Sequence, residues 1–91
     1  MKETTITRGI MKMLKEHHVW AFKVAGGPYQ QAGVPDIVGC LGGKFFAIEV
    51  KVPGNKPTPL QEKVMQDIEN AGGAVSVAYS VDDVRKYLDL E

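Results

Sequence analysis

Residues 33–51 constrain this chain more than any other part of the sequence. They are typical of two β-strands joined by a glycine turn, because both halves are rich in branched and aromatic residues. Three charged residues interrupt the strands. Asp36 lies in the first, and Glu49 and Lys51 lie in the second, where a long apolar run predicts deep burial. Charges at buried strand positions are costly unless they are paired or bind a ligand, so these residues are candidates for a functional site.

The three charged side chains are expected to converge. Side chains alternate between the faces of a strand, so Glu49 and Lys51 project from the same face, roughly 6.6 Å apart along the strand. Asp36 can reach the same point from the neighbouring strand. Two carboxylates and an amine at one point indicate a metal-dependent phosphodiesterase, because ions such as Mg²⁺ prefer carboxylate, backbone carbonyl and water oxygens. We expect Asp36, Glu49 and the carbonyl of Val50 as ligands. Lys51 would position or deprotonate the attacking water, or stabilise the charge of the transition state.

A simpler alternative is that Glu49 and Lys51 form an ion pair on a solvated sheet face, with Asp36 as a turn residue. A Glu-x-Lys triplet alone is a weak signal, since average composition produces one in about a third of chains this long. A Pro-Asp pair shortly upstream lowers that frequency to about 1–2%. Both motifs also lie in predicted strands, so the combination favours the catalytic site.

Size and composition limit the remaining possibilities. We expect the 91 residues to form a single domain over residues 1–91. The formal net charge is zero, which weakens a pure DNA-binding module more than a nuclease, whose bound metal would supply positive charge at the phosphate. The single cysteine, Cys40, has no disulfide partner and is interpreted as a small buried hydrophobic residue. No apolar run approaches the roughly 20 residues of a membrane span, and no signal peptide precedes the first predicted helix, so we expect a cytoplasmic protein without membrane contact.

The order of elements predicted along the chain is α-β-β-β-α-β-α. Hydrophobic periodicity, branched runs and capping signals define the elements. They are a helix over 3–17, strands over 19–24, 35–41 and 44–52, a helix that opens at Thr58-Pro59-Leu60-Gln61 and ends at Gly72-Gly73, a strand over 74–79, and a short helix capped by residues 80–83. The second helix is expected to bury Leu60, Val64 and Ile68, with Met65 near this face.

In the motifs around Asp36, Glu49 and Lys51, the chain resembles the PD-(D/E)XK nuclease superfamily, and specifically its VRR-NUC branch. The resemblance covers nearly the whole chain. It is carried by Glu3 in the first predicted helix, by residues 33–39 (Gly-Val-Pro-Asp-Ile-Val-Gly), by residues 47–51 (Ala-Ile-Glu-Val-Lys) and by residues 59–61 (Pro-Leu-Gln). The resemblance implies an α/β fold of the restriction-endonuclease type. This fold has an αβββαβ core with a mixed central sheet flanked by helices, and the short C-terminal helix is an addition to it.

The resemblance also implies roles for individual residues. Members of the superfamily are Mg²⁺- or Mn²⁺-dependent nucleases, with Asp36 and Glu49 at ligand positions and Lys51 at the catalytic position. Glu3 would be a third acidic ligand, directly or through water, although an acid at a helix start is also favoured by the helix dipole. Gln61 matches a glutamine that the family has near its site, and a helix-capping box explains it equally well.

The expected substrate is DNA, and most specifically branched DNA. Stand-alone members of the branch resemble phage and viral Holliday-junction resolvases, so we expect a homodimeric endonuclease in a phage or bacterial host cell. A nicking, flap or restriction-type nuclease would share the same chemistry, and a non-catalytic nucleic-acid-binding module would keep the fold. Candidate DNA contacts lie on the first predicted strand and in the loops flanking the central stretch: Lys23, Gly26, Gly27, Tyr29 and Lys56.

Overall fold

The computed structural model describes residues 2–26 and 31–91 and has the predicted α/β order of elements. The helices are α1 (Glu3–Glu16), α2 (Pro59–Asn70) and α3 (Val81–Tyr87), and the strands are β1 (Trp20–Lys23), β2 (Ile37–Leu41), β3 (Lys44–Val50) and β4 (Ala74–Ala78). Each strand is one or two residues shorter than expected, so Asp36 and Lys51 lie just outside β2 and β3. Within the described residues, none of the helices has the length and apolar character needed to cross a membrane.

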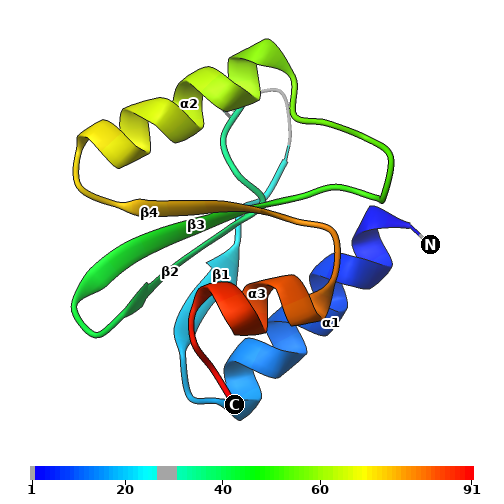
Figure 1. Cartoon of the computed structure of the whole chain (residues 1–91), viewed down its shortest axis with the longest axis vertical. Helices are drawn as coiled ribbons and strands as arrows, with labels where there is room; N and C mark the ends of the chain where they lie inside the picture. The colour runs from blue at the N-terminus through cyan, green and yellow to red at the C-terminus, as the bar shows by residue number, and fades with distance from the viewer. Residues whose placement is uncertain (1, 27–30) are drawn as a thin grey trace.

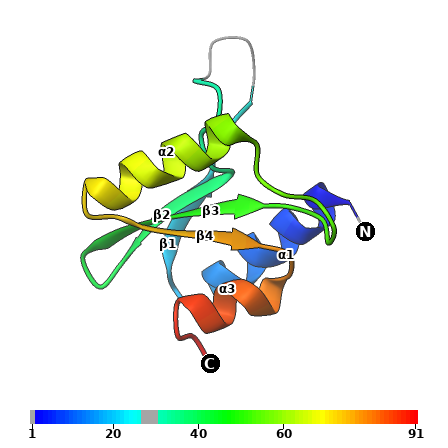
Figure 2. The same cartoon turned by 45° about the horizontal axis from the view of Figure 1, so that its top comes forward.

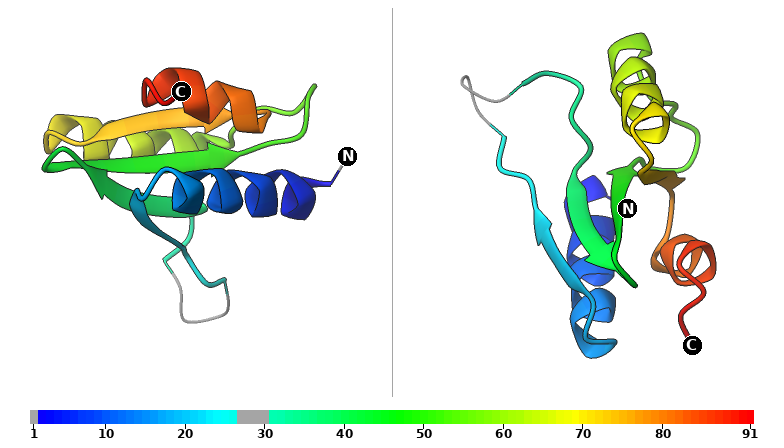
Figure 3. Two further views of the ribbon diagram at one scale, coloured as in Figure 1. Left: turned by 90° about the horizontal axis from the view of Figure 1, so that it is seen from below. Right: turned by 90° about the vertical axis from the view of Figure 1, so that its left-hand side faces the viewer.

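The strands form one mixed sheet in the order β1-β2-β3-β4. β2 is antiparallel to both β1 and β3, whereas β4 runs parallel to β3. α2 covers one face of the sheet, and α1 and α3 pack together on the other (Figures 1 and 2). The side views in Figure 3 show α1 beside the β1 end of the sheet and α3 beside β4. The mixed sheet flanked by helices that the resemblance implies is therefore confirmed.

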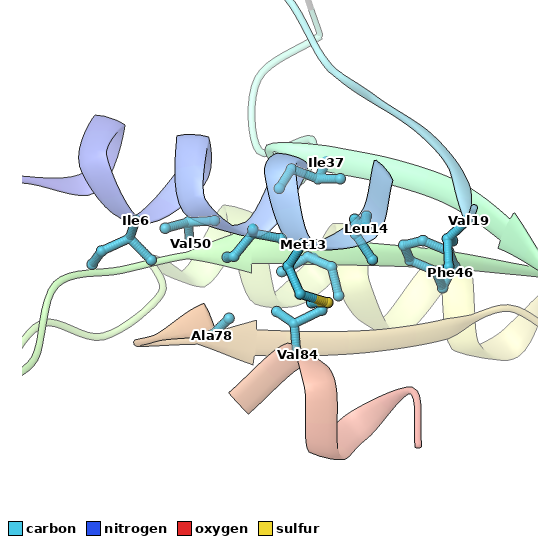
Figure 4. Close-up of a cluster of buried hydrophobic side chains, with 11 residues drawn as sticks. Ile6, Met13, Leu14, Val19, Ile37, Phe46, Val50, Ala78 and Val84 are labelled. Carbon is cyan, nitrogen blue, oxygen red and sulfur yellow. The ribbon is translucent and has the colours of Figure 1, made fainter. Parts of the chain in front are cut away.

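The main hydrophobic core lies between the sheet and the layer of α1 and α3 (Figure 4). The apolar stripe predicted for α1 faces this core, and its members are at most 3% exposed. The cluster comprises Ile6, Ile10, Met13, Leu14, Val19, Ile37, Phe46, Ile48, Val50, Ala78 and Val84. Because Phe46, Ile48 and Val50 on β3 point into this core, strand alternation turns Glu49 toward the opposite face, which α2 covers.

A two-residue turn at Gly42-Gly43 fixes the register of β2 and β3. Both glycines have positive φ, 60° and 80°, as a type I′ hairpin turn requires. The pairing extends from the turn to Ile37 opposite Ile48. Continuing the same register by one residue places Asp36 opposite Glu49. The hairpin therefore brings the two carboxylates together across neighbouring strands.

Cys40 was expected to be buried, and this is wrong, because its side chain is exposed. In the sheet register Cys40 lies between Trp20 on β1 and Phe45 on β3, which are 64% and 45% exposed. These three neighbours share one face of the sheet. No described helix covers this end of that face, so its apolar residues stay in contact with solvent.

The buried face of α2 also differs from the prediction. Leu60 is 50% exposed, Val64 and Ile68 are half-buried, and Met65 is the residue of α2 that is buried in the described structure. The first turns of α2 pack against the backbone at Gly33, where a Cβ would lie 2.9 Å from Cγ of Leu60. Leu60 therefore contacts a loop instead of the sheet, which leaves half of its surface exposed.

Candidate active site

Asp36 is held in place by two hydrogen bonds. Its Oδ2 accepts a hydrogen bond from the backbone N–H of Val50 at 2.8 Å, and its backbone carbonyl accepts one from the N–H of Val24 at 2.8 Å. Val24 directly follows β1, and Val50 ends β3. The carboxylate of Asp36 is therefore bound to the N–H of Val50, the residue between Glu49 and Lys51, as the predicted convergence requires.

Glu49 is a buried carboxyl group, only 2% exposed. Its Oε2 accepts a hydrogen bond from Nε2 of Gln61 at 3.1 Å and lies 3.9 Å from Nζ of Lys51. Its Oε1 has no hydrogen-bond partner among the described residues. The Lys51 side chain is itself only 13% exposed. Glu49 and Lys51 thus lie within ion-pair distance, as the simpler alternative expected, but the solvated sheet face that this alternative assumed is wrong.

The environment of Glu49 disfavours its charged form. Burial, and after it the negative charge of Asp36, raises the pKa of Glu49 to about 8, whereas the positive charge of Lys51 opposes this shift. Like charges on directly opposed strand residues repel each other, as these two carboxylates would. At neutral pH, without a bound cation, Glu49 is therefore mostly protonated.

Gln61 connects the site to the start of α2. Its Oε1 accepts a hydrogen bond from the N–H of Thr58 at 2.8 Å, and its own N–H donates to Oγ1 of Thr58 at 3.2 Å, which completes a capping box. The same side chain donates through Nε2 to Glu49. The two explanations that the sequence left open are thus compatible, because one amide caps the helix with its oxygen and contacts the site with its nitrogen.

Gly33 positions the loop that carries Asp36, and this role was not predicted from the sequence. Its φ is +84°, and a Cβ would lie 2.9 Å from Cγ of Leu60 and 3.1 Å from Cγ2 of Val64. Few side chains adopt this backbone conformation, and none has room here. The loop leading to Asp36 therefore packs directly on the helix that carries Gln61. The glycine three residues before Asp36 is the sequence signal that indicates it.

The donors at this point fit a hard divalent cation. The unpartnered Oε1 of Glu49 and the opposed carboxylate of Asp36 supply oxygens of the kind that Mg²⁺ and Mn²⁺ prefer, and the Val50 backbone lies beside them. Glu3 does not complete a cluster, because residues 2–26 and 31–91 contain no group of three or more Asp, Glu, His or Cys side chains close enough to hold a metal. Its charge nonetheless contributes to the raised pKa of Glu49. A ligand role for Glu3, directly or through water, stays a prediction.

Two of the candidate DNA contacts lie beside Asp36. Lys23 and Gly26 line a depression of about 230 Å³ together with Asp36. Lys56 is exposed in the loop between β3 and α2. Two candidates lie outside the described residues: Gly27 and Tyr29. The structure therefore brings Lys23 and Gly26 close to a candidate metal ligand, and their contact with DNA is a proposal.

Comparison with known proteins agrees with this geometry. The VRR-NUC domain family matches residues 8–82, a range that includes Asp36, Glu49, Lys51 and Gln61. No curated protein sequence matches the chain. VRR-NUC domains are nucleases of the PD-(D/E)XK type, which generally use divalent metals, and their activity implies DNA as the substrate. By the extent of this match, the chain belongs to the VRR-NUC family of PD-(D/E)XK nucleases.

Proposed function

We propose that this chain is a structure-specific DNA endonuclease that uses Mg²⁺ or Mn²⁺ and cuts branched DNA, such as Holliday junctions, as a homodimer. The observation that carries the catalytic part is the buried Glu49, with one unpartnered oxygen, opposite Asp36 and beside Lys51. The junction substrate and the homodimer are supported by the resemblance to phage and viral resolvases. Small size also supports the homodimer, since a chain of this length buries only about 60–65% of its unfolded surface alone.

Each residue of the site has a definable task. Asp36 and Glu49 would hold the cation, which when bound supplies positive charge at the scissile phosphate and activates water for attack. Glu49 must release its proton before it can act as a ligand, because ligating carboxyl groups are ionised. Lys51 would orient the attacking water or stabilise the negative charge that develops on the phosphate oxygens. Gln61 would fix the orientation of Glu49 through its hydrogen bond to Oε2.

The catalytic proposal is tested by cleavage of end-labelled DNA in the presence of Mg²⁺ or Mn²⁺. Asp36→Asn and Lys51→Gln are each expected to lower the cleavage rate by about 10²–10⁴-fold, the usual loss when one group that acts in the transition state is removed. Asp67→Asn and Lys63→Gln are matched controls, because these residues form an exposed ion pair on α2, and both should cleave at the wild-type rate. Unchanged cleavage by Asp36→Asn would contradict the proposal.

The substrate is tested by comparing rates on a four-way junction, a flap and a linear duplex, and the oligomer by light scattering. We expect the junction to be cut fastest and the mass to be that of a dimer. Faster cleavage of the flap or the linear duplex would instead identify a nicking, flap or restriction-type enzyme. DNA binding without cleavage in either metal would identify the non-catalytic module.

A further inference from the structure

A groove of about 740 Å³ between α1 and β1 is lined by apolar side chains and by three positively charged ones. Arg8, Lys12 and Lys15 contribute to it from α1, and all three are exposed. Their spacing of four and three residues places them on one side of the helix. His18 and Trp20 line the groove where the chain turns from α1 into β1. Figures 1 and 3 show these two elements side by side at one edge of the sheet.

The groove concentrates positive charge that the chain as a whole lacks. The formal net charge is zero, yet the described residues that line the groove include no acidic side chain. Within residues 2–26 and 31–91, the three groove cations form no ion pair, whereas Lys63, Arg85 and Lys86 on α2 and α3 are paired with acidic neighbours. Unpaired cations clustered on one face are the electrostatic signature of contact with a polyanion.

The groove lies close to the candidate active site along β1. Ala21 lines the groove, and three residues later the N–H of Val24 donates to the carbonyl of Asp36. At about 3.3 Å per residue, the strand covers about 10 Å between these two points. This distance corresponds to the rise of about three base pairs of duplex DNA. The groove lies on the α1 side of the sheet and Glu49 lies on the α2 side, so a DNA arm that contacts both passes around the edge strand β1.

The geometry points to DNA as the occupant. The stripe from Arg8 to Lys15 extends about 10 Å along α1, a length over which one DNA strand presents about three phosphates. Trp20 lines the groove from the edge strand β1, but its side chain points to the sheet face opposite to α1, where it is 64% exposed and packs edge-on against Phe22. An exposed aromatic side chain at a sheet edge can stack on the bases of DNA whose backbone is bound by nearby cations. An acidic protein partner would match the charge, but the exposed tryptophan and the neighbouring phosphodiesterase site favour nucleic acid.

We propose that Arg8, Lys12 and Lys15 bind the phosphates of the DNA arm that leads to the active site, with Trp20 against its bases or sugars. The choice of DNA as the occupant rests on the proposed function. The groove itself is independent of catalysis, because it would bind phosphates whether or not Asp36 and its neighbours hydrolyse them.

The test uses the intrinsic fluorescence of Trp20, which is the only tryptophan of the chain. The full chain is titrated with duplex DNA and with a four-way junction in EDTA, over a series of KCl concentrations. We expect bound DNA to change the emission of Trp20. The triple variant Arg8→Gln/Lys12→Gln/Lys15→Gln should bind at least about tenfold more weakly, and its slope of log K against log salt should be shallower by about 2.7, or about 0.9 for each lost phosphate contact.

A matched triple variant separates a local contact from a general effect of charge. Lys63→Gln/Arg85→Gln/Lys86→Gln changes the net charge equally but lies on α2 and α3, so its salt slope should equal that of the wild type. Thermal unfolding verifies that both variants are folded. Equal slopes for the two triple variants would overturn the groove assignment, as would Trp20 emission that saturating DNA leaves unchanged. Binding of a poly-glutamate peptide as tightly as DNA would also overturn it, in favour of a protein partner.

Cleavage in Mg²⁺, measured separately, keeps this inference distinct from the proposed function. The groove variant should show a raised KM with an unchanged kcat, since its substitutions leave the reacting groups intact. Wild-type protein that binds DNA through the groove but cleaves none would uphold the groove and contradict the nuclease. Normal cleavage together with an unchanged salt slope in the groove variant would uphold the nuclease and overturn the groove.

Discussion

Neutralising Glu49 should make the metal-free protein more stable, although it should abolish function. The folded-state pKa of Glu49 is about 8, mainly because the side chain is buried, and the ordinary value is 4.5. The unfolded chain therefore releases this proton near pH 4.5, whereas the folded chain keeps it up to about pH 8. The stabilisation linked to the bound proton is fully present below pH 4.5, decreases steadily as the pH rises from 4.5 to 8, and is lost above pH 8.

The magnitude follows from the width of this window. Between pH 4.5 and pH 7, an interval of about 2.5 pH units, the free energy of unfolding falls by about 1.4 kcal/mol per unit. The loss is therefore about 3 kcal/mol at pH 7, and it reaches about 5 kcal/mol above pH 8. Glu49→Gln removes the ionisation and keeps the shape, but it still buries a polar amide. We expect a net gain of about 1–3 kcal/mol at pH 7, or about 5–20 °C in Tm for a domain of this size.

The assay is thermal unfolding followed by circular dichroism in EDTA at pH 5, 7 and 9. The difference in Tm between Glu49→Gln and the wild type should increase with pH, whereas Glu62→Gln, an exposed carboxylate on α2, should show no such trend. Saturating Mg²⁺ should stabilise the wild type and narrow the difference, because the ligand binds only the folded state. A variant less stable than the wild type at pH 9, or a difference independent of pH, would refute this reasoning.

Two further predictions concern the residues around the carboxylates. Gln61→Glu should keep the helix cap, since Glu also suits this position of a capping box, but it places a second carboxylate beside Glu49. The cleavage rate should therefore fall at least about tenfold, with little change in Tm. Gln61→Ala should lose cleavage together with about 1 kcal/mol of stability, so unfolding and cleavage measured on both variants separate the two roles. Gly33→Ala should lower the free energy of unfolding, measured in urea, by about 2–4 kcal/mol, and Gly54→Ala should lower it by only about 1 kcal/mol. Both glycines have positive φ, but only at Gly33 would the new Cβ clash with Leu60. Equal costs for the two glycines would contradict the close approach.

The fold and the main site residues were predictable because their signals are local. The spacing of apolar residues defined α1, and the capping residues defined the start of α2. The convergence of Asp36 and Glu49 was predictable for the same reason. Asp36 lies six residues before Gly42, and Glu49 lies six residues after Gly43, so a two-residue turn must place them opposite each other. The fixed register of a short hairpin thus positions the two carboxylates of the site.

Features that depend on packing between distant segments were not predictable. Whether Cys40 or Leu60 is buried depends on which part of the sheet α2 covers, and hydrophobicity alone does not specify this. The contact of Gln61 with Glu49 requires that the loop between β3 and α2 return to the sheet end. The basic stripe that begins at Arg8 has helical spacing in the sequence, but the net charge of zero does not indicate it, and the groove forms only because β1 lies beside α1.

The most direct test of the central claim is a calorimetric titration of Mn²⁺ into the wild-type protein at pH 7, in two buffers of different ionisation enthalpy. If Asp36 and Glu49 hold the cation, binding should be saturable and should release close to one proton, because Glu49 with a pKa of about 8 gives up its proton to become a ligand. Asp36→Asn should abolish this binding. Indistinguishable isotherms for Asp36→Asn and the wild type, or no binding by the wild type even with DNA present, would contradict a metal-dependent nuclease site at these residues.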